Sequence, residues 1–422
     1  MLLIKNALVF CENGFERGDI AIDGGLFAEI RAAGDGIPGA PPDCEIIDAE
    51  SCYAIPGLID IHFHGCMGCD FSSASVGEMS MMARYQARNG VTAICPATMT
   101  LPEDALALAC GRMAELAARQ RGGSQGGAGF GERAGKTGAG GAGAGKIGTV
   151  AGGTRASGTG EAAAGASDAG GATAGASGAY YAGAAGARPI EDAESALIGI
   201  NLEGPFISAE KLGAQNPAYV RPPSLPMFDR LQAASGGLIK LLAIAPETEG
   251  AMGMISALRD RVTVSLAHTA AGYSLSKEAF AAGARHVTHL YNAMLPFAHR
   301  EPGLPGAAFD TPGVMAELIC DGVHVHPAAA RATFRLLGDS RVALVSDSMM
   351  ATGLSDGMYE LGGLPVRVSG NRAVLASGGG IAGSVTNLMD CLRVAVRDMG
   401  IPLHSAVKCA SANPARAIGA YG

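Results

Sequence analysis

The chain has 422 residues, of which 48% are hydrophobic and 17% are charged, and its net charge at pH 7 is −8. This apolar fraction is ample for a large core and excludes a wholly disordered protein. The acidic balance argues against a nucleic-acid-binding surface, which needs clustered lysine and arginine, and no apolar run is long enough to span a membrane. Ten cysteines without tight periodic spacing do not suggest a disulfide framework, so we expect a reducing, cytoplasmic setting.

Residues 1–54 predict the amino-terminal part of a small β domain. Short apolar runs at 2–4, 7–10 and 19–22 are separated by turn-prone residues such as Asn6 and Gly14. This alternation is typical of short antiparallel strands.

From residue 55 onward the pattern predicts βα units, because apolar β-prone runs alternate with longer helical stretches. Helices are expected at 102–119, 249–260, 275–282 and 327–337. Strands are expected at 59–61, 93–94, 198–202, 241–244, 262–267, 286–288, 318–320 and 342–346. Nearly all of these strands end in a polar or metal-binding side chain. Eight such units, at 55–121 and 188–422, fit an α/β fold of the (β/α)₈ TIM-like barrel type, whose active site lies at the carboxyl ends of the strands.

Residues 122–187 predict a disordered insertion in this barrel. The segment holds 24 glycines and 20 alanines and has no apolar periodicity, so it cannot bury enough surface to offset its ordering entropy. It falls between the second helix and the third strand, which places it on the face opposite the active site. We expect its removal to leave activity largely intact.

The candidate metal ligands follow the predicted strands. His62-Phe63-His64 comes just after the first strand, and alternation along an extended chain places both imidazoles on one face. Each of the remaining candidates ends a different strand: Glu203, His268, His289 and Asp347. Four imidazoles and two carboxylates at one barrel mouth suit one or two divalent transition ions. The alternative, that each side chain only caps its own loop, accounts for any single one of them but poorly for six.

The stretch Pro56–Gly65, with sequence PGLIDIHFHG, resembles the opening motif of the amidohydrolase superfamily. Further motifs resemble one member family, the N-acetylglucosamine-6-phosphate deacetylases, in order and spacing along nearly the whole chain outside the insertion. They lie at 90–92, 96–98, 202–207, 267–269, 288–294, 299–303, 321–324, 346–347 and 382–384. The resemblance implies an amidohydrolase barrel joined to a small β-sandwich domain.

The resemblance also implies a metal site. Glu203, His268 and His289 would hold the main ion, and His62 and His64 would help to hold a second. Zinc is the expected metal, with iron, manganese and cobalt as alternatives, at one or two ions per subunit.

The implied reaction is hydrolysis of the N-acetyl group of N-acetyl-D-glucosamine 6-phosphate to D-glucosamine 6-phosphate and acetate, in amino-sugar catabolism. Asp347 would be the catalytic acid/base, taking a proton from water and delivering it to the departing amine; its alternative is a structural ion pair. Three other functions stay open: deacetylation of the galacto epimer, another amidohydrolase reaction, and a catalytically silent relative that only binds sugar phosphate.

For the substrate, the resemblance points to a phosphate site at Arg300 and His324 that a homodimer completes, since part of it comes from the neighbouring subunit. A surface ion pair with Glu301 is the alternative for Arg300. The remaining substrate-binding candidates are Gln215, Asn292, Ala293, Ile381, Ala382 and Gly383.

Three positions depart from the family pattern. Gln215 stands where many members carry a histidine that touches the substrate. Cys66 and Cys69 form a C-x-x-C after the paired histidines; we favour loop cysteines in place of family glycines over a redox or metal site. The chain stops at Gly422 where family members continue with strands of the small domain, so we expect that domain to be truncated and to expose apolar surface.

Overall fold

The computed structural model describes residues 1–123 and 193–420, apart from positions 25, 33, 35, 36, 38, 40 and 42. The predicted insertion at 122–187 therefore lies outside the described residues, except that Gly122 and Gly123 end helix α2.

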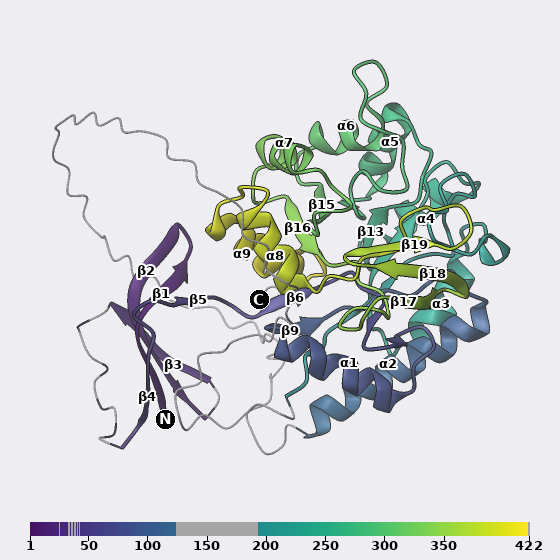
Figure 1. The fold of residues 1–422 in the computed structure, drawn as a ribbon. Helices are drawn as coiled ribbons and strands as arrows, with labels where there is room; N and C mark the ends of the chain where they lie inside the picture. The colour runs from purple at the N-terminus through teal and green to yellow at the C-terminus, as the bar shows by residue number, and fades with distance from the viewer. Residues whose placement is uncertain are drawn as a thin grey trace, which may run out of the picture. The chain divides into compact units, whose positions relative to one another are not determined.

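Parallel strands form the centre of the fold, and each predicted strand is present (Figure 1). Six of them make one sheet in chain order: β11 (Ile200–Leu202), β12 (Ile239–Ile244), β13 (Thr263–Leu266), β14 (His286–Val287), β15 (Met315–Ile319) and β16 (Val342–Val345). A second parallel sheet joins β6 (Leu58–Asp60), β9 (Val91–Ile94) and β10 (Ala196–Leu197). The six-stranded sheet is a half-barrel, consistent with a TIM-like domain.

Two contacts link the sheets at the carboxyl ends of their strands. A parallel bridge pairs Ala97 with Asn201, and the backbone N–H of Asp347 donates to the carbonyl of His62 over 2.9 Å. The first and last parallel strands therefore meet where the candidate ligands lie.

Helices pack on the outside of these strands (Figure 1). They are α1 (Val76–Arg88), α2 (Glu103–Gly123), α3 (Leu225–Ala234), α4 (Ala251–Leu258), α5 (Tyr273–Ala282), α6 (Gly303–Phe309), α7 (Pro327–Leu337), α8 (Leu388–Arg397), α9 (Leu403–Ala410) and α10 (Ala412–Ala417). The four predicted helices correspond to α2, α4, α5 and α7. Helix α1 was not predicted, although Ser75 and Glu78 form a capping box that fixes its start. Among the described helices, none has the length and apolarity to cross a membrane.

Strand alternation divides the buried side chains between two cores. On β15, Leu318 packs in the large cluster between strands and helices, whereas Ile319 and Met315 belong to a cluster inside the barrel. Glu317 lies between Leu318 and Ala316, so the period of two directs its side chain inward with Ile319. A carboxylate thus enters the barrel interior between two apolar residues of its own strand, with the buried His286 of β14 beside it.

The amino-terminal strands form a sheet of order β3 (Leu26–Ala32), β2 (Gly14–Asp23), β1 (Leu2–Cys11) and β4 (Glu45–Asp48), with β5 (Tyr53–Ala54) also paired to β1. The expectation of antiparallel strands holds for β1, β2 and β3 but is wrong for β4 and β5, which run parallel to β1. Asn6 does not separate two strands, because β1 continues through it with a shift of register and a φ of 63°.

This sheet exposes large apolar side chains, among them Phe27, Ile30 and Ile46. The expectation that the small domain is truncated concerns chain beyond residue 422 and stays a prediction.

An antiparallel sheet that the sequence analysis missed follows β16. It consists of β17 (Gly357–Leu361), β18 (Leu364–Ser369) and β19 (Arg372–Leu375). The turns between them are the two-residue pairs Gly362-Gly363 and Gly370-Asn371, which favour tight hairpins. Its buried side chains pack with Met99 and Ala382 near the candidate site.

Candidate active site

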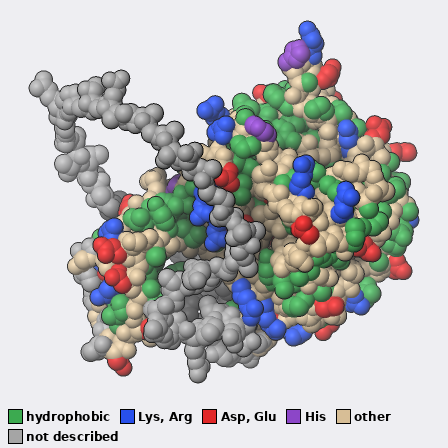
Figure 2. Space-filling model, in the orientation of Figure 1, with side chains coloured by type: hydrophobic (Ala, Val, Ile, Leu, Met, Phe, Trp, Pro, Cys, Tyr) green, Lys and Arg blue, Asp and Glu red, His purple; other side chains and the backbone are tan. Residues whose placement is uncertain are grey.

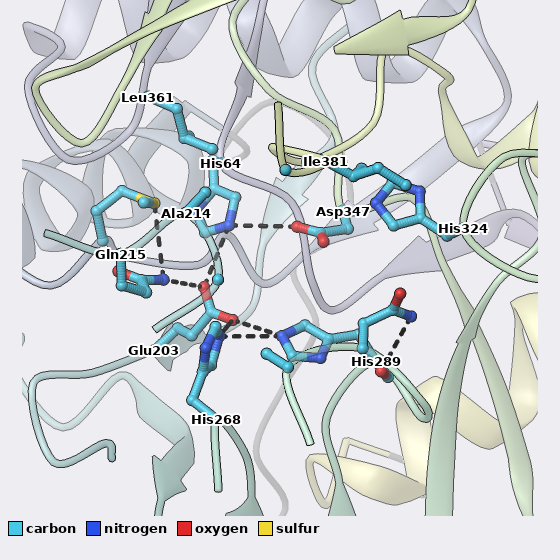
Figure 3. Close-up of a pocket in the computed structure, with 16 residues that line it drawn as sticks. His64, Glu203, Ala214, Gln215, His268, His289, His324, Asp347, Leu361 and Ile381 are labelled. Carbon is cyan, nitrogen blue, oxygen red and sulfur yellow. Dashed lines mark hydrogen bonds and ion pairs between the residues drawn. The ribbon is translucent and has the colours of Figure 1, made fainter. Parts of the chain in front are cut away.

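The candidate ligands converge from the ends of separate strands. Glu203 follows β11, His268 follows β13 and His289 follows β14. His62 and His64 follow β6, and Asp347 follows β16. Figure 3 shows the Glu203 carboxylate at the centre, with Gln215, His64, His268 and His289 directed toward it.

One group of ligand atoms is formed by Glu203, His268 and His289. The Oε1 atom of Glu203 lies 3.0 Å from Nε2 of His268 and 3.1 Å from Nε2 of His289. The two imidazole nitrogens are 3.1 Å apart. Two ring nitrogens and one carboxylate oxygen at this spacing are a typical donor set for a transition-metal ion.

A second group consists of His62, His64 and Asp347. Asp347 Oδ1 lies 3.3 Å from Nε2 of His64 and 3.6 Å from Nε2 of His62. Glu203 joins the groups, since its two oxygens lie 3.3 Å from His62 Nε2 and 3.2 Å from His64 Nε2. In the described part of the chain, the buried Nε2 of His62 has no hydrogen-bond partner. A buried nitrogen left unpaired beside two carboxylates fits a site built for a cation.

The backbone at three of these positions is unusual. His268, His289 and Asp347 have φ angles of 44°, 27° and 47°, in the left-handed region that side chains with a Cβ avoid. Each such residue costs about 1–3 kcal/mol and persists where the surrounding fold fixes it, most often at functional sites. The strand ends turn here so that the side chains reach the barrel mouth.

The pKa values of the two buried carboxylates are lowered by neighbouring histidines, against the effect of burial. Burial would raise the pKa of Asp347, but the hydrogen bond from His64 and the charges of His62 and His64 lower the pKa to about 2. Burial opposes ionisation of Glu203 as well, yet His62 and the bonds from His268 and His289 hold its pKa well below the usual range. Both carboxylates are therefore ionised at neutral pH.

These residues open onto a cavity of about 300 Å³. The predicted substrate residues that line it are Gln215, Asn292, Ala293, His324, Ile381 and Gly383. Ala382 is buried behind the cavity wall, in the cluster with Met99. Arg300 lies exposed in a loop before α6 and is outside this cavity in a single chain.

Other lining residues were missed by the sequence analysis. They are Met99, Gly213, Ala214 and Leu361. All of these are small or apolar residues with no chemical signature in the sequence, and only the fold brings them here.

Hydrogen bonds to both ends of its amide group fix the Gln215 side chain. Its Oε1 accepts from the backbone N–H of Thr100 over 2.7 Å, and its Nε2 donates to Glu203 Oε2 over 3.0 Å. The glutamine that departs from the family pattern thus contacts a proposed metal ligand.

His324 is oriented by Asp321. One oxygen of Asp321 accepts from the backbone N–H groups of Val323 and His324, and the other lies 2.7 Å from Nδ1 of His324. Burial would lower the pKa of His324, but this bond and the charge of Asp321 raise it. A histidine whose pKa is raised at the cavity wall suits an anionic group of a ligand.

The C-x-x-C residues lie in a hairpin beside the site. Cys66 and Cys69 face each other between β7 (Gly65–Cys66) and β8 (Cys69–Asp70). Burial raises the pKa of the Cys66 thiol above its usual range, which disfavours the thiolate that metal binding and redox chemistry need. Neither cysteine belongs to the two ligand groups found among the described residues.

Histidines and carboxylates at the carboxyl ends of parallel strands define the site of a metal-dependent amidohydrolase, and the family model described as "Amidohydrolase family" matches residues 156–422. An N-acetylglucosamine-6-phosphate deacetylase of Bacillus subtilis (strain 168) is 32% identical over 394 residues, which cover 93% of this chain and 81% of the relative. The chain therefore belongs to the N-acetylglucosamine-6-phosphate deacetylase family of amidohydrolases.

Two further comparisons bear on the substrate. An N-acetylgalactosamine-6-phosphate deacetylase of Escherichia coli O157:H7 is 30% identical over 397 residues, covering 93% of this chain and 86% of the relative. The crystal structure of N-acetyl-D-glucosamine-6-phosphate deacetylase from Mycobacterium smegmatis matches with a TM-score of 0.76 and 28% identity, covering 99% of this chain and 91% of that one.

Proposed function

We propose that the protein hydrolyses the N-acetyl group of N-acetyl-D-glucosamine 6-phosphate, giving acetate and D-glucosamine 6-phosphate, in amino-sugar catabolism. The observation that carries this proposal is the convergence of Glu203, His268 and His289 beside Asp347 at the floor of one cavity (Figure 3). The named relatives support the substrate, and a mutant of the Mycobacterium smegmatis enzyme, 29% identical, has been crystallised in complex with N-acetyl-D-glucosamine-6-phosphate.

The ligand groups fit a divalent ion, as their unpaired nitrogens and ionised carboxylates indicate. A bound divalent ion supplies the Lewis acidity that polarises an amide carbonyl and lowers the pKa of water. Glu203, His268 and His289 would hold the main ion, and His62 and His64 would contribute to a second. Zinc suits this donor set, with iron, manganese and cobalt as alternatives.

Asp347 is placed to move the proton. Its Oδ1 lies at the edge of the ligand groups and its side chain faces the cavity. As an ionised carboxylate facing the cavity, Asp347 would accept the proton of the attacking water and then deliver it to the amine nitrogen as the C–N bond breaks. General acid–base catalysis of this kind contributes roughly 10²- to 10⁴-fold.

The rest of the cavity would hold the sugar phosphate. His324, oriented by Asp321, which also raises its pKa, would offer a donor to the phosphate. Arg300 lies outside the cavity of its own chain, and we propose that it reaches the phosphate of the neighbouring subunit in a homodimer. The backbone at Gly380 and Gly383 lines the cavity and lets the chain approach the ligand closely.

Acetate release from three substrates tests the activity. The purified, metal-analysed protein is assayed with N-acetylglucosamine 6-phosphate, its galacto epimer and the unphosphorylated sugar. Release from the first substrate at the highest kcat/KM supports the proposal; preference for the second assigns the galactosamine activity instead. No release from any of them by folded, metal-loaded protein refutes it.

A pair of variants tests the role of Asp347. Asp347→Asn should reduce kcat by roughly 10²- to 10⁴-fold while the protein stays folded. The control is Asp398→Asn, at an exposed position after α8, which should keep full turnover. Full turnover by Asp347→Asn would overturn the assigned mechanism.

A further inference from the structure

Glu317 is a fully buried carboxylate that the proposed reaction does not use. It lies on β15 with no exposed surface and points into the barrel interior, on the level beneath the ligand groups. The neighbouring inward residues of the same strand, Met315 and Ile319, are apolar. A carboxylate in such surroundings is costly unless hydrogen bonds compensate it.

One oxygen of Glu317 contacts a member of each ligand group. Its Oε2 lies 2.8 Å from Nδ1 of His62 and accepts the backbone N–H of His289 over 3.0 Å. A backbone N–H can only donate, so Oε2 acts as an acceptor. The ring of His62 therefore carries a proton on Nδ1, and the neutral form of such a ring has its lone pair on Nε2.

This tautomer is the one that a metal ligand needs. The Nε2 atom of His62 faces Glu203 Oε1 at 3.3 Å and Asp347 Oδ1 at 3.6 Å, and the described residues offer it no hydrogen-bond partner. A histidine ligand is commonly oriented by a carboxylate on its other nitrogen, which also makes the coordinating nitrogen more basic.

The second hydrogen bond of Glu317 Oε2, from the N–H of His289, constrains the backbone. His289 has a φ of 27°, a conformation that persists only where the fold holds it. The same oxygen that orients His62 therefore also fixes the point from which the His289 side chain enters the site.

We propose that Glu317 is the positioning residue that couples the two ligand groups, holding His62 as the Nδ1–H tautomer and the backbone of His289 in place for metal binding. The inference rests on the metal site of the proposed function. The other oxygen of Glu317, Oε1, has no hydrogen-bond partner within the described structure and lies 3.9 Å from Nδ1 of His286.

Metal binding, measured without substrate, tests the proposal. Glu317→Leu removes both acceptor contacts at similar volume, whereas Glu317→Gln keeps an oxygen for both N–H groups. Zinc stoichiometry and affinity are determined by competition with a chromophoric chelator, and the melting temperature of the metal-free protein reports on folding. We expect zinc affinity to fall about 10- to 100-fold in Glu317→Leu and to be largely restored in Glu317→Gln.

Ser265→Ala is the matched control. Ser265 is buried on β13, where it contacts His286 and Thr288 but no proposed ligand. Its replacement should leave zinc affinity unchanged. Wild-type affinity and stoichiometry in folded Glu317→Leu would overturn the proposal.

The wild-type protein provides a test that does not depend on the folding of a variant. In the zinc-loaded protein, nitrogen-15 spectra of the histidine rings should show His62 protonated at Nδ1, assigned by loss of the signal in His62→Gln. A His62 ring without a proton on Nδ1 would overturn the inference. A protein whose zinc affinity depends on Glu317 but that releases no acetate would refute the proposed function alone.

Discussion

A methyl group added at Gly204 should disturb the site by an amount that the structure allows us to work out. Gly204 follows the proposed ligand Glu203 and has a φ of +78°, so any other residue there costs about 1–2 kcal/mol for the left-handed conformation. Its new Cβ would overlap Oγ1 of Thr100 and lie 3.1 Å from the Thr100 Cβ. Overpacking of a buried site adds about 1–3 kcal/mol. We therefore expect Gly204→Ala to lower the free energy of unfolding by about 2–5 kcal/mol.

Thr100→Ala separates the two contributions. The Thr100 hydroxyl has no hydrogen-bond partner in the described structure, so its removal should cost about 1 kcal/mol for the lost methyl group. In the double variant the overlap is relieved while the cost of the positive φ remains. The double-mutant cycle, measured by urea unfolding of the metal-free proteins, should show a favourable coupling of about 1–3 kcal/mol.

Zinc affinity, measured for the same set of variants, tests the effect on the candidate metal site. A shift of the backbone at Gly204 moves the adjacent Glu203, so Gly204→Ala should bind zinc more weakly and Thr100→Ala should restore part of the affinity. The reasoning is refuted if Gly204→Ala is as stable as the wild type, or if the coupling energy is zero.

Three other outcomes follow from the site. Asp321→Asn should lower the pKa of His324, because the hydrogen bond and charge of Asp321 raise it. Phosphate binding by the protonated ring should then be lost at a lower pH than in the wild type. A KM–pH profile whose alkaline limb does not move would contradict this. Gln215→Leu removes the donor to Glu203 Oε2, a bond to a charged group contributing about 1.5–3 kcal/mol, so zinc should bind about tenfold more weakly or worse; unchanged affinity would count against that bond. Cys52 is the exposed cysteine, whereas six are buried, so Ellman's reagent should label Cys52 first, and rapid labelling of the buried thiols in folded protein would show that the core opens.

The parallel strands and the clustering of the candidate ligands could be predicted because nearly every apolar run ends in a polar or metal-binding side chain. His268, His289 and Asp347 each follow a short apolar segment, and strand ends in a parallel sheet share one edge. Their left-handed backbone could not be predicted, since it arises where the turn of the chain and the surrounding packing over-determine the conformation.

Other features were hidden in the sequence for physical reasons. Glu317 lies inside the apolar run Met315–Ile319 and ends no strand, so only strict alternation along β15 could have placed it inside the barrel. The β17–β19 sheet had a usable signal in Gly362-Gly363 and Gly370-Asn371, since paired turn residues between β-prone runs indicate hairpins. The cavity residues Met99 and Leu361 come together only through tertiary packing.

The hydrogen bond from the Asp347 amide to the His62 carbonyl has a consequence for how the enzyme matures. These residues follow the last and first parallel strands, so almost the whole barrel must be synthesised before Asp347 meets the paired histidines. A chain emerging from the ribosome exposes the H-x-H long before its carboxylate partners exist. Such distant pairings form late in folding, so metal retention would report that the barrel has closed.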